Sequence, residues 1–474
     1  MALGRRNREQ QQTLWVATEK LAAAPRHVFY ERLNRLLTEA GFDKWLETRC
    51  RRYYSQDGRP SIPPGVFFRM VFIGYFENID SQRGIAWRCS DSLSLKAFLG
   101  YAPHQETPDH SSLTRIRNRL PEPVFDEVFQ MVLRIVETHG LLDGRTMGVD
   151  STTLEANAAM KAIVRRDTNE DWTNYLKRLA AEDGVPAETK PELIRYDKKR
   201  NKKGKKKVSN DDWTSPADPD ARITRMKDGT TNLAYKAEHV VDLKTEVIVS
   251  ATIHHADQAD SATITSSVAK AQENLDQTEA KPEIAKVTAD KGYHKLDVLV
   301  ACETLTHSPI KTYIPEADNR WNRCWDDKTA EQERAYRLNR DRTQRAYGKR
   351  LQRRRSEVVE RSFGHICDTG QGRRSWLRGI VNVTKRYQMQ AAAYNLGIVL
   401  RKLLGAGKPR AFWALWACFC AHLMRLTALT AALRTIQVRS HDCGTRVDEL
   451  FDDFDPNRSC WGDRFFITPC STGC

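Results

Sequence analysis

The chain lacks two features that would direct it out of the cytoplasm. Its first twenty residues contain no continuous apolar run, so we expect no secretory signal. Residues 411–433 approach the length of a bilayer span, but His422 and Arg425 interrupt the middle, where charge is costly. A helix packed on the protein or covering a partner fits this segment better. We therefore expect a cytoplasmic protein that does not bind a membrane.

Cysteine pairs that would predict disulfides or a zinc site are also missing. Five of the 11 cysteines stand singly in the first 400 residues: Cys50, Cys89, Cys302, Cys324 and Cys367. An isolated cysteine in a large, unsecreted chain is usually a small buried hydrophobe. Cys418, Cys420 and His422 have a C-x-C-x-H spacing, but no second pair follows at a zinc-ligand distance. The pattern disfavours a metal site there.

Acidic residues are in deficit, with 61 Asp and Glu against 76 Lys and Arg, which gives a net charge of +15. Such a balance favours a polyanionic partner, and DNA or RNA comes before a membrane surface. A solvated basic surface is the alternative that composition leaves open. The 474 residues are 40% apolar, which is enough for two or three domains with substantial cores and excludes a wholly disordered chain.

Residues 1–144 carry apolar side chains mainly at helical spacing. Pro63 and Pro64 are placed to open one helix, and Asp109 is placed to cap another. Gly140 is a plausible stop for the last helix of this region. The pattern predicts an all-helical N-terminal domain, either DNA-binding or a bundle with no binding role.

Residues 145–404 change to a pattern of mixed strands and helices. Met147 and Val149 precede Asp150 in one strand, and a β-meander over residues 233–253 has its turn at 242–246. A helix follows, and then a buried-type strand that ends at Asp290. Strand, hairpin, helix and strand again is the order of an RNase H-like α/β core. We predict a mixed sheet flanked by helices, with ligands at its strand ends.

Three acids far apart in the sequence are candidate catalytic and metal-binding residues: Asp150, Asp290 and Glu360. Val359, Phe363 and Ile366 form an apolar stripe that would dock the helix carrying Glu360, with Glu357 as the rival acid one turn earlier. Carboxylate oxygens suit Mg²⁺, which prefers a few carboxylates plus substrate phosphates. Beside the positive charge, this set points to a nucleic-acid-cutting enzyme. The alternative is that either glutamate is a surface residue paired to nearby arginines.

Basic residues gather in an insertion at about residues 160–228 and in the helical segment 331–355. They would bind phosphates without regard to sequence, although the insertion could equally be a solubilising loop. Lys291 and Tyr293 follow Asp290 in a tight turn and could reach phosphate or a base. The candidate DNA contacts are Lys198, Lys199, Arg200, Lys202, Lys203, Lys205, Lys206, Lys207, Lys291, Tyr293, Arg350, Arg353, Arg354, Arg355 and Arg361.

Taken in order, these stretches resemble the DDE transposases of bacterial insertion sequences, which have a helical N-terminal domain followed by an RNase H-like catalytic domain. The likeness spans residues 27–404 and rests on three groups of motifs. The first is GRPSIPPGVFFRMVFIGYFENIDSQRGIAWRC with TPDHSSLTRIRNRL, and the second is SPADPDARI with LAYKAEHVVD and HHADQADS. The third is TADKGYH with RSEVVERSFGHI. The order of the motifs, as well as their wording, agrees with this family.

The resemblance implies a DNA transposase whose triad is Asp150, Asp290 and Glu360, and two Mg²⁺ ions, which Mn²⁺ can replace. Such an enzyme binds double-stranded DNA at element ends, cleaves it and joins the 3′ ends to target DNA. A homodimer on DNA at the bacterial nucleoid is expected on the same ground. A related subgroup has a lysine seven residues after the glutamate, where this chain has Cys367.

Two alternatives to this function stay open. One is a catalytically decayed, transposase-derived DNA-binding protein, and the other is a different RNase H-like endonuclease. Residues 405–474 resemble nothing in the catalytic core and are treated as a C-terminal extension of unknown role. The predicted domains are therefore residues 1–144, 145–404 and 405–474.

Overall fold

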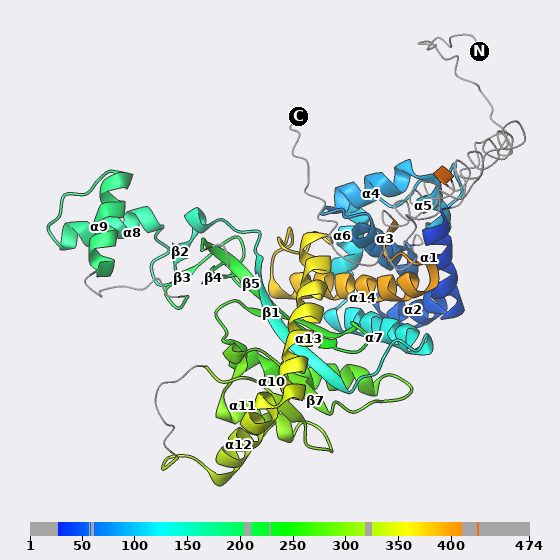
Figure 1. The fold of residues 1–474 in the computed structure, drawn as a ribbon. Coiled ribbons are helices and arrows are strands. Elements are labelled where there is room, and N and C mark those ends of the chain that lie inside the picture. The colour runs from blue at the N-terminus through cyan, green and yellow to red at the C-terminus, as the bar shows by residue number, and fades with distance from the viewer. Residues whose placement is uncertain are drawn as a thin grey trace, which may run out of the picture. The chain divides into compact units, whose positions relative to one another are not determined.

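The structure is a computed structural model that describes residues 27–55, 57, 61–202, 210–226, 229–317, 325–409 and 424–425 (Figure 1). The chain divides into two compact units, residues 1–413 and 414–474. All elements named below belong to the first unit. The segment with Cys418, Cys420 and His422 and most of the predicted C-terminal extension lie outside the described residues.

The N-terminal region is helical, as predicted. α3 begins at Pro64, whose missing N–H is harmless in a first turn, and the Asp109 side chain caps α6 by accepting from the Ser112 amide. Gly140 adopts a φ of +65° just after the last helix. The helices are α1 Val28–Glu39, α2 Phe42–Cys50, α3 Pro64–Phe76, α4 Gln82–Asp91, α5 Leu93–Leu99, α6 His110–Arg119 and α7 Glu122–Thr138.

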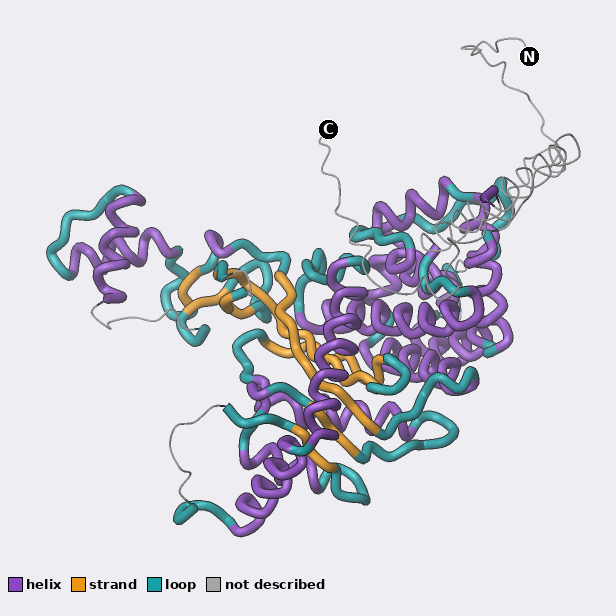
Figure 2. Tube along the Cα trace, viewed as in Figure 1, coloured by secondary structure: helices purple, strands orange, loops and turns teal. Residues whose placement is uncertain are grey.

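A six-stranded mixed sheet follows, in the order β4-β5-β1-β7-β8 with β6 also paired to β5 (Figure 2). β1 is antiparallel to β5 and parallel to β7, and β7 is parallel to β8. The strands are β1 Thr146–Glu155, β4 Arg222–Arg225, β5 Thr231–Asp242, β6 Ile248–His255, β7 Lys286–Thr288 and β8 Lys311–Tyr313. The predicted hairpin turn at 242–246 is confirmed, and residues 233–243 of the predicted meander belong mainly to the single strand β5.

Helices cover both faces of the sheet. Met147 and Val149 of β1 point into one apolar cluster with α10 (Asp260–Asp276), α11 (Leu296–Glu303) and α12 (Ala330–Gln344). The other face packs on α13 (Ala346–Phe363) and α14 (Ile380–Leu404). In Figure 1 the orange α14 lies among the blue N-terminal helices, and it contacts α3 and α7 as well as β6. The predicted α/β fold with a preceding helical region is confirmed, and both parts share one core.

The described part of the predicted basic insertion contains both strands and helices. It contains the short paired strands β2 (Val164–Arg165) and β3 (Trp213–Thr214) and the helices α8 (Trp172–Glu182) and α9 (Lys190–Lys202). α8 and α9 bury Tyr175, Leu176, Leu193 and Tyr196. These apolar positions explain why a region so rich in lysine still forms helices. Lys203, Lys205, Lys206 and Lys207 lie outside the described residues.

The solitary cysteines are buried, as predicted. Cys50, Cys89, Cys302 and Cys367 are buried, whereas Cys324 lies outside the described residues. Within the ranges given above, no helix is both long enough and apolar enough to cross a membrane.

His239 of β5 joins α13 and α14 to the sheet through buried hydrogen bonds. Its Nδ1 lies 2.8 Å from Ser362 Oγ, and its Nε2 lies 2.8 Å from the Tyr387 hydroxyl. The Phe363 ring stacks on the imidazole with 3.9 Å between centroids. Burial lowers the pKa of His239 to about 3, because the charged form cannot be solvated there.

We expect His239 to make the fold sensitive to acid. The unfolded chain takes up a proton at this residue near pH 6.5 and the folded protein only near pH 3. Its contribution to stability is therefore complete above about pH 6.5 and is lost as pH falls, at about 1.4 kcal/mol per pH unit. Urea unfolding at pH 6.5 and pH 5 measures this loss, expected at about 2 kcal/mol. His239→Gln keeps one hydrogen-bond donor and one acceptor but cannot titrate, so it should remove this part of the pH dependence of stability. An unchanged pH dependence in the variant would show that His239 is not its source.

Candidate active site

Two of the predicted acids lie on neighbouring segments of the sheet, Asp150 within β1 and Asp290 just after β7. β1 and β7 pair in parallel, with Met147 opposite Val287 and Gly148 opposite Thr288. The pairing ends at Gly148 and Thr288, so Asp150 and Asp290 each lie two residues beyond the last pair. Neighbouring strands lie about 4.8 Å apart, so the two backbones hold these carboxylates at one edge of the sheet. Parallel pairing thus joins residues 140 positions apart in the sequence.

Asp150 is held from two sides. Its Oδ1 accepts from the Ser151 amide at 2.8 Å, and its Oδ2 lies 2.8 Å from Arg355 Nη1 of α13. Burial raises the pKa of the Asp150 carboxyl, while the Arg355 guanidinium opposes that rise and the negative charge of Asp290 adds to it. The influence of Asp290 on the pKa of Asp150 agrees with their placement at the same edge.

Asp290 opens a tight turn whose far end is anchored in the core. Its carboxylate accepts from the Gly292 amide and so caps the single 3₁₀ turn at Lys291–Tyr293. Tyr293 is fully buried, and its hydroxyl donates to Glu238 Oε1 at 2.9 Å. Burial raises the pKa of Glu238, a β5 residue with no exposed surface. This core contact fixes the turn that orients Asp290.

A further acid, Asp260 at the start of α10, borders the same edge. A Cβ added to Gly292 would lie 3.1 Å from Asp290 Oδ1 and 3.2 Å from Asp260 Oδ2, so both carboxylates flank this glycine. Asp260 Oδ1 accepts from Ser151 Oγ at 2.8 Å and from Lys236 Nζ at 3.2 Å. The charge of Asp260 is therefore balanced by a buried lysine.

α13 crosses the sheet and carries Glu360 (Figure 1). Gln352 of this helix donates to the carbonyl oxygens of Ala289 and Tyr313, at the carboxyl ends of β7 and β8. Glu360 lies eight residues later, which places it about 80° around the helix and about 12 Å along its axis from Gln352. Its side chain is exposed.

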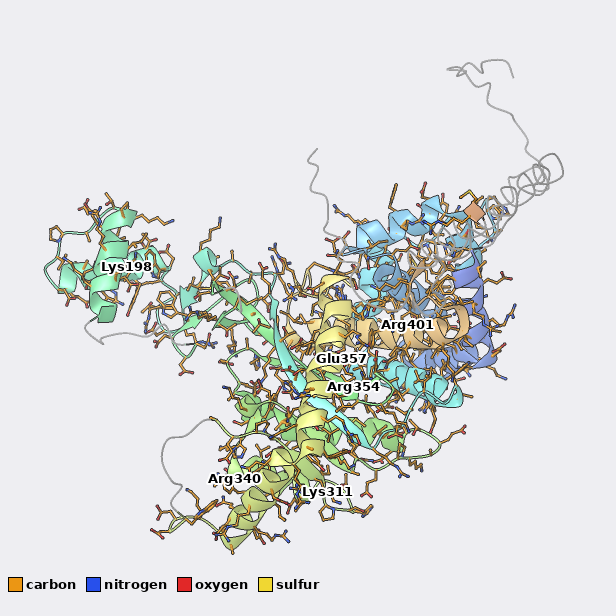
Figure 3. All side chains as sticks on the ribbon, in the orientation of Figure 1. Lys198, Lys311, Arg340, Arg354, Glu357 and Arg401 are labelled. Carbon is orange, nitrogen blue, oxygen red and sulfur yellow. The ribbon has the colours of Figure 1, made fainter. Side chains whose placement is uncertain are left out.

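Glu357, the rival acid, has different partners. Its carboxylate pairs with Arg354 at 3.3 Å and with Arg361 at 2.6 Å, and Figure 3 shows Glu357 beside Arg354 on α13. Both arginines also pair with Glu246, in the turn between β5 and β6. Glu357 therefore belongs to a surface ion-pair group on the other side of the helix from Gln352.

The donor set fits a divalent oxygen-loving cation. In the described part of the chain, no group of three or more His, Cys, Asp or Glu side chains is close enough to hold one ion. Asp150 in β1 and Asp290 just after β7 are nevertheless neighbouring carboxylates, and Mg²⁺ commonly uses one or two carboxylates together with phosphate oxygens of a substrate. The candidate site is thus an acidic edge to which a phosphate would add ligands.

The predicted DNA contacts have different environments. Lys198, Lys199, Lys291, Arg350 and Arg353 are exposed, whereas Arg354 and Arg361 are partly buried in the ion pairs with Glu357 and Glu246. Arg355 is only 8% exposed and faces Asp150, and Tyr293 faces Glu238. Arg200 and Lys202 lie in α9, and only their backbone is described.

Sequence reasoning missed the roles of Arg355, Asp260 and Glu238 at this edge. For Arg355 a clue existed, because the apolar stripe of Val359, Phe363 and Ile366 passes through residue 355 when it is extended back by one turn. An arginine on the buried face of a helix needs a carboxylate partner. Nothing in the sequence identified Asp150 as that partner.

Two protein families match parts of the chain. Residues 18–119 match the family described as "Transposase domain (DUF772)", and residues 323–400 match the family described as "Transposase DDE domain". The second match includes α13 and Glu360, and it begins after β1 and β7 in the sequence. No curated protein and no solved structure matches the chain.

Gly148 is predicted to be required for the docking of α13. A Cβ at this position would lie 2.6 Å from Leu243 Cδ2, 3.0 Å from Val359 Cγ2 and 3.2 Å from Arg355 Cγ. Gly148→Ala should therefore displace the helix and lower the free energy of unfolding by about 1–3 kcal/mol. Gly364→Ala, where no neighbour lies within 4 Å, is the matched control and should show no such loss. Equal urea-unfolding curves for the two variants would show that α13 does not pack on Gly148 this closely.

Proposed function

We propose that this chain, which belongs to the DDE transposase family, binds the ends of its element, cleaves the DNA and joins the 3′ ends to target DNA by metal-dependent phosphoryl transfer. The parallel pairing of β1 with β7, which ends two residues before both Asp150 and Asp290, is the observation that carries this proposal. The matched DDE domain, which includes Glu360 on the crossing helix, supports the third acid.

In the proposed reaction, the metal would stabilise charge on the phosphate and the protein would hold the metal. Asp150, Asp290 and Glu360 are the residues that would hold divalent metal, and Mg²⁺ or Mn²⁺ supplies Lewis-acid stabilisation of the phosphoryl oxygens when bound. Parallel pairing of β1 with β7 supports the first two carboxylates of the set, and the third, Glu360, is carried by α13. No protein nucleophile is required, since water and then a DNA 3′-hydroxyl attack phosphorus.

Exposed basic residues would hold the substrate. Lys291 follows Asp290 directly, and Arg350 and Arg353 are exposed on α13. Lys and Arg neutralise phosphates and release counterions, so they give affinity without reading sequence. We further propose that two copies of the chain act on paired element ends, as the family resemblance implies.

Neutral substitutions of the three acids are predicted to abolish cleavage without weakening DNA binding. Asp150→Asn, Asp290→Asn and Glu360→Gln each remove a metal ligand while leaving side-chain volume unchanged. A metal contribution of several kcal/mol corresponds to a loss of about 10³-fold in cleavage rate. The assay is cleavage of a supercoiled plasmid carrying the element's ends, with Mg²⁺ and then with EDTA, beside a gel-shift measurement of affinity.

Glu357→Gln is the control for Glu360→Gln, because Glu357 lies one turn away in an ion pair with Arg354. It should keep its cleavage activity. Equal loss of binding and cleavage in Asp150→Asn would count against that ligand. A wild-type chain that binds the ends but never cuts them would be a DNA-binding protein without catalysis. Nicking without joining to a second DNA would indicate another type of endonuclease.

Lys198 and Lys199 of α9 provide a test of non-specific DNA contact (Figure 3 labels Lys198). Each lysine on a phosphate adds about one to the slope of log affinity against log salt. The double change Lys198→Ala and Lys199→Ala should reduce that slope by about two. Lys311→Ala, exposed at the start of β8 and away from the carboxyl strand ends, is the control. An unaltered slope in the double variant would favour a solubilising role for α9.

A further inference from the structure

An ion pair joins the buried Arg355 to the partly buried Asp150 at the proposed site. Arg355 is 8% exposed, and its Nη1 lies 2.8 Å from Asp150 Oδ2. Its Nη2 donates to Ser356 Oγ at 3.2 Å, and its Nε is buried with no hydrogen-bond partner among the described residues. A guanidinium in such a place is costly unless a carboxylate faces it. Asp150 is therefore the group that makes the burial of Arg355 tolerable.

The pair leaves room for a metal on the same carboxylate. Each oxygen of an ionised carboxylate has two lone-pair positions. Oδ1 uses one for the Ser151 amide, and Oδ2 uses one for Arg355. One position therefore remains on each oxygen. A cation can bind Asp150 without displacing the arginine, so the two contacts are compatible.

Packing restricts where the Arg355 side chain can go. Its Cγ lies against Gly148, where an added Cβ would be only 3.2 Å away, and Val359 covers the same glycine one turn later. The stem of Arg355 is thus confined between β1 and α13. The guanidinium reaches Asp150 of β1 from α13, the helix that also carries Glu360. This contact therefore links the strand of one acid to the helix of another.

We propose that Arg355 is a positioning residue for the metal site. Its guanidinium holds the Asp150 carboxylate toward Asp290 and fixes α13 over β1. This role rests on the proposed function. Hydrogen-bonding partners of metal-ligating carboxylates orient their ligands, and their loss commonly costs 10–100-fold in metal affinity or activity. Arg355 acts through Asp150 and contacts no DNA.

Direct metal binding tests this role without relying on turnover. Mn²⁺ alone is titrated into the full-length chain and followed by electron paramagnetic resonance, for the wild type, Arg355→Gln and Arg355→Lys. Arg355→Gln should weaken Mn²⁺ binding by about 10–100-fold. Arg355→Lys keeps the charge without the planar fork and should recover part of the affinity. Cleavage by Arg355→Gln should then recover at high metal concentration, whereas Asp150→Asn should not.

The control is Arg345→Gln, at the start of the same helix, where the guanidinium pairs with Asp341 at the exposed surface. It should bind Mn²⁺ as the wild type does. Unchanged Mn²⁺ binding by folded Arg355→Gln would overturn the proposal. Tighter Mn²⁺ binding would also overturn it, because it would show that the arginine competes with the metal for Asp150. If Arg355→Gln does not fold, wild-type affinity in Arg355→Lys would overturn it.

The same titration separates the two proposals. If the wild type binds Mn²⁺ through Asp150, shown by loss of binding in Asp150→Asn, and the Arg355 variants match it, only the role of Arg355 fails. If the wild type binds no Mn²⁺, with or without DNA, the proposed function fails and the role of Arg355 fails with it.

Discussion

Parallel pairing of β1 with β7 holds two acids, Asp150 and Asp290, at one end of the sheet. Parallel strands cannot be joined by a tight turn, so the chain between them must leave the sheet and return. Here it does so through the insertion, β4, β5, β6 and α10, and two of these elements contribute an acid near Asp290 or its turn, Glu238 of β5 and Asp260 of α10. The acidic edge is a consequence of this route. Without the pairing of β1 with β7, nothing else in the sheet would bring the two aspartates close together.

α13 is the second determinant of the site. One face of this helix packs on Gly148 and His239, and the same face carries Arg355 to Asp150. The hydroxyl of Tyr387 on α14 completes the buried hydrogen bonds around His239. Because α14 also packs among the N-terminal helices, the position of α13 depends on the helical region as well as on the sheet. The N-terminal helices and the sheet are therefore joined through a common core.

The fold could be predicted to a large extent because its elements have strong local patterns. Met147 and Val149 bury one face of β1, Pro64 opens α3, and Asp109 caps α6, and each of these effects acts within a few residues. The burial of Arg355 could not be predicted from local pattern. Arg353, Arg354 and Arg355 are chemically identical neighbours, and only the rotation of α13 against the sheet makes the first exposed, the second paired with Glu246 and the third buried.

The sequence by itself determined which residues can supply oxygen ligands, which segments become strands or helices, and the strongly basic charge that favours DNA. These properties are set by side-chain chemistry and short-range periodicity. Only the tertiary structure decided that Asp150 and Asp290 lie near each other, that Asp260 borders the same edge, and that Arg355 pairs with Asp150. Those contacts join residues about 30 to more than 200 positions apart, and no short-range pattern encodes them, because they arise from strand register and helix rotation in the folded core.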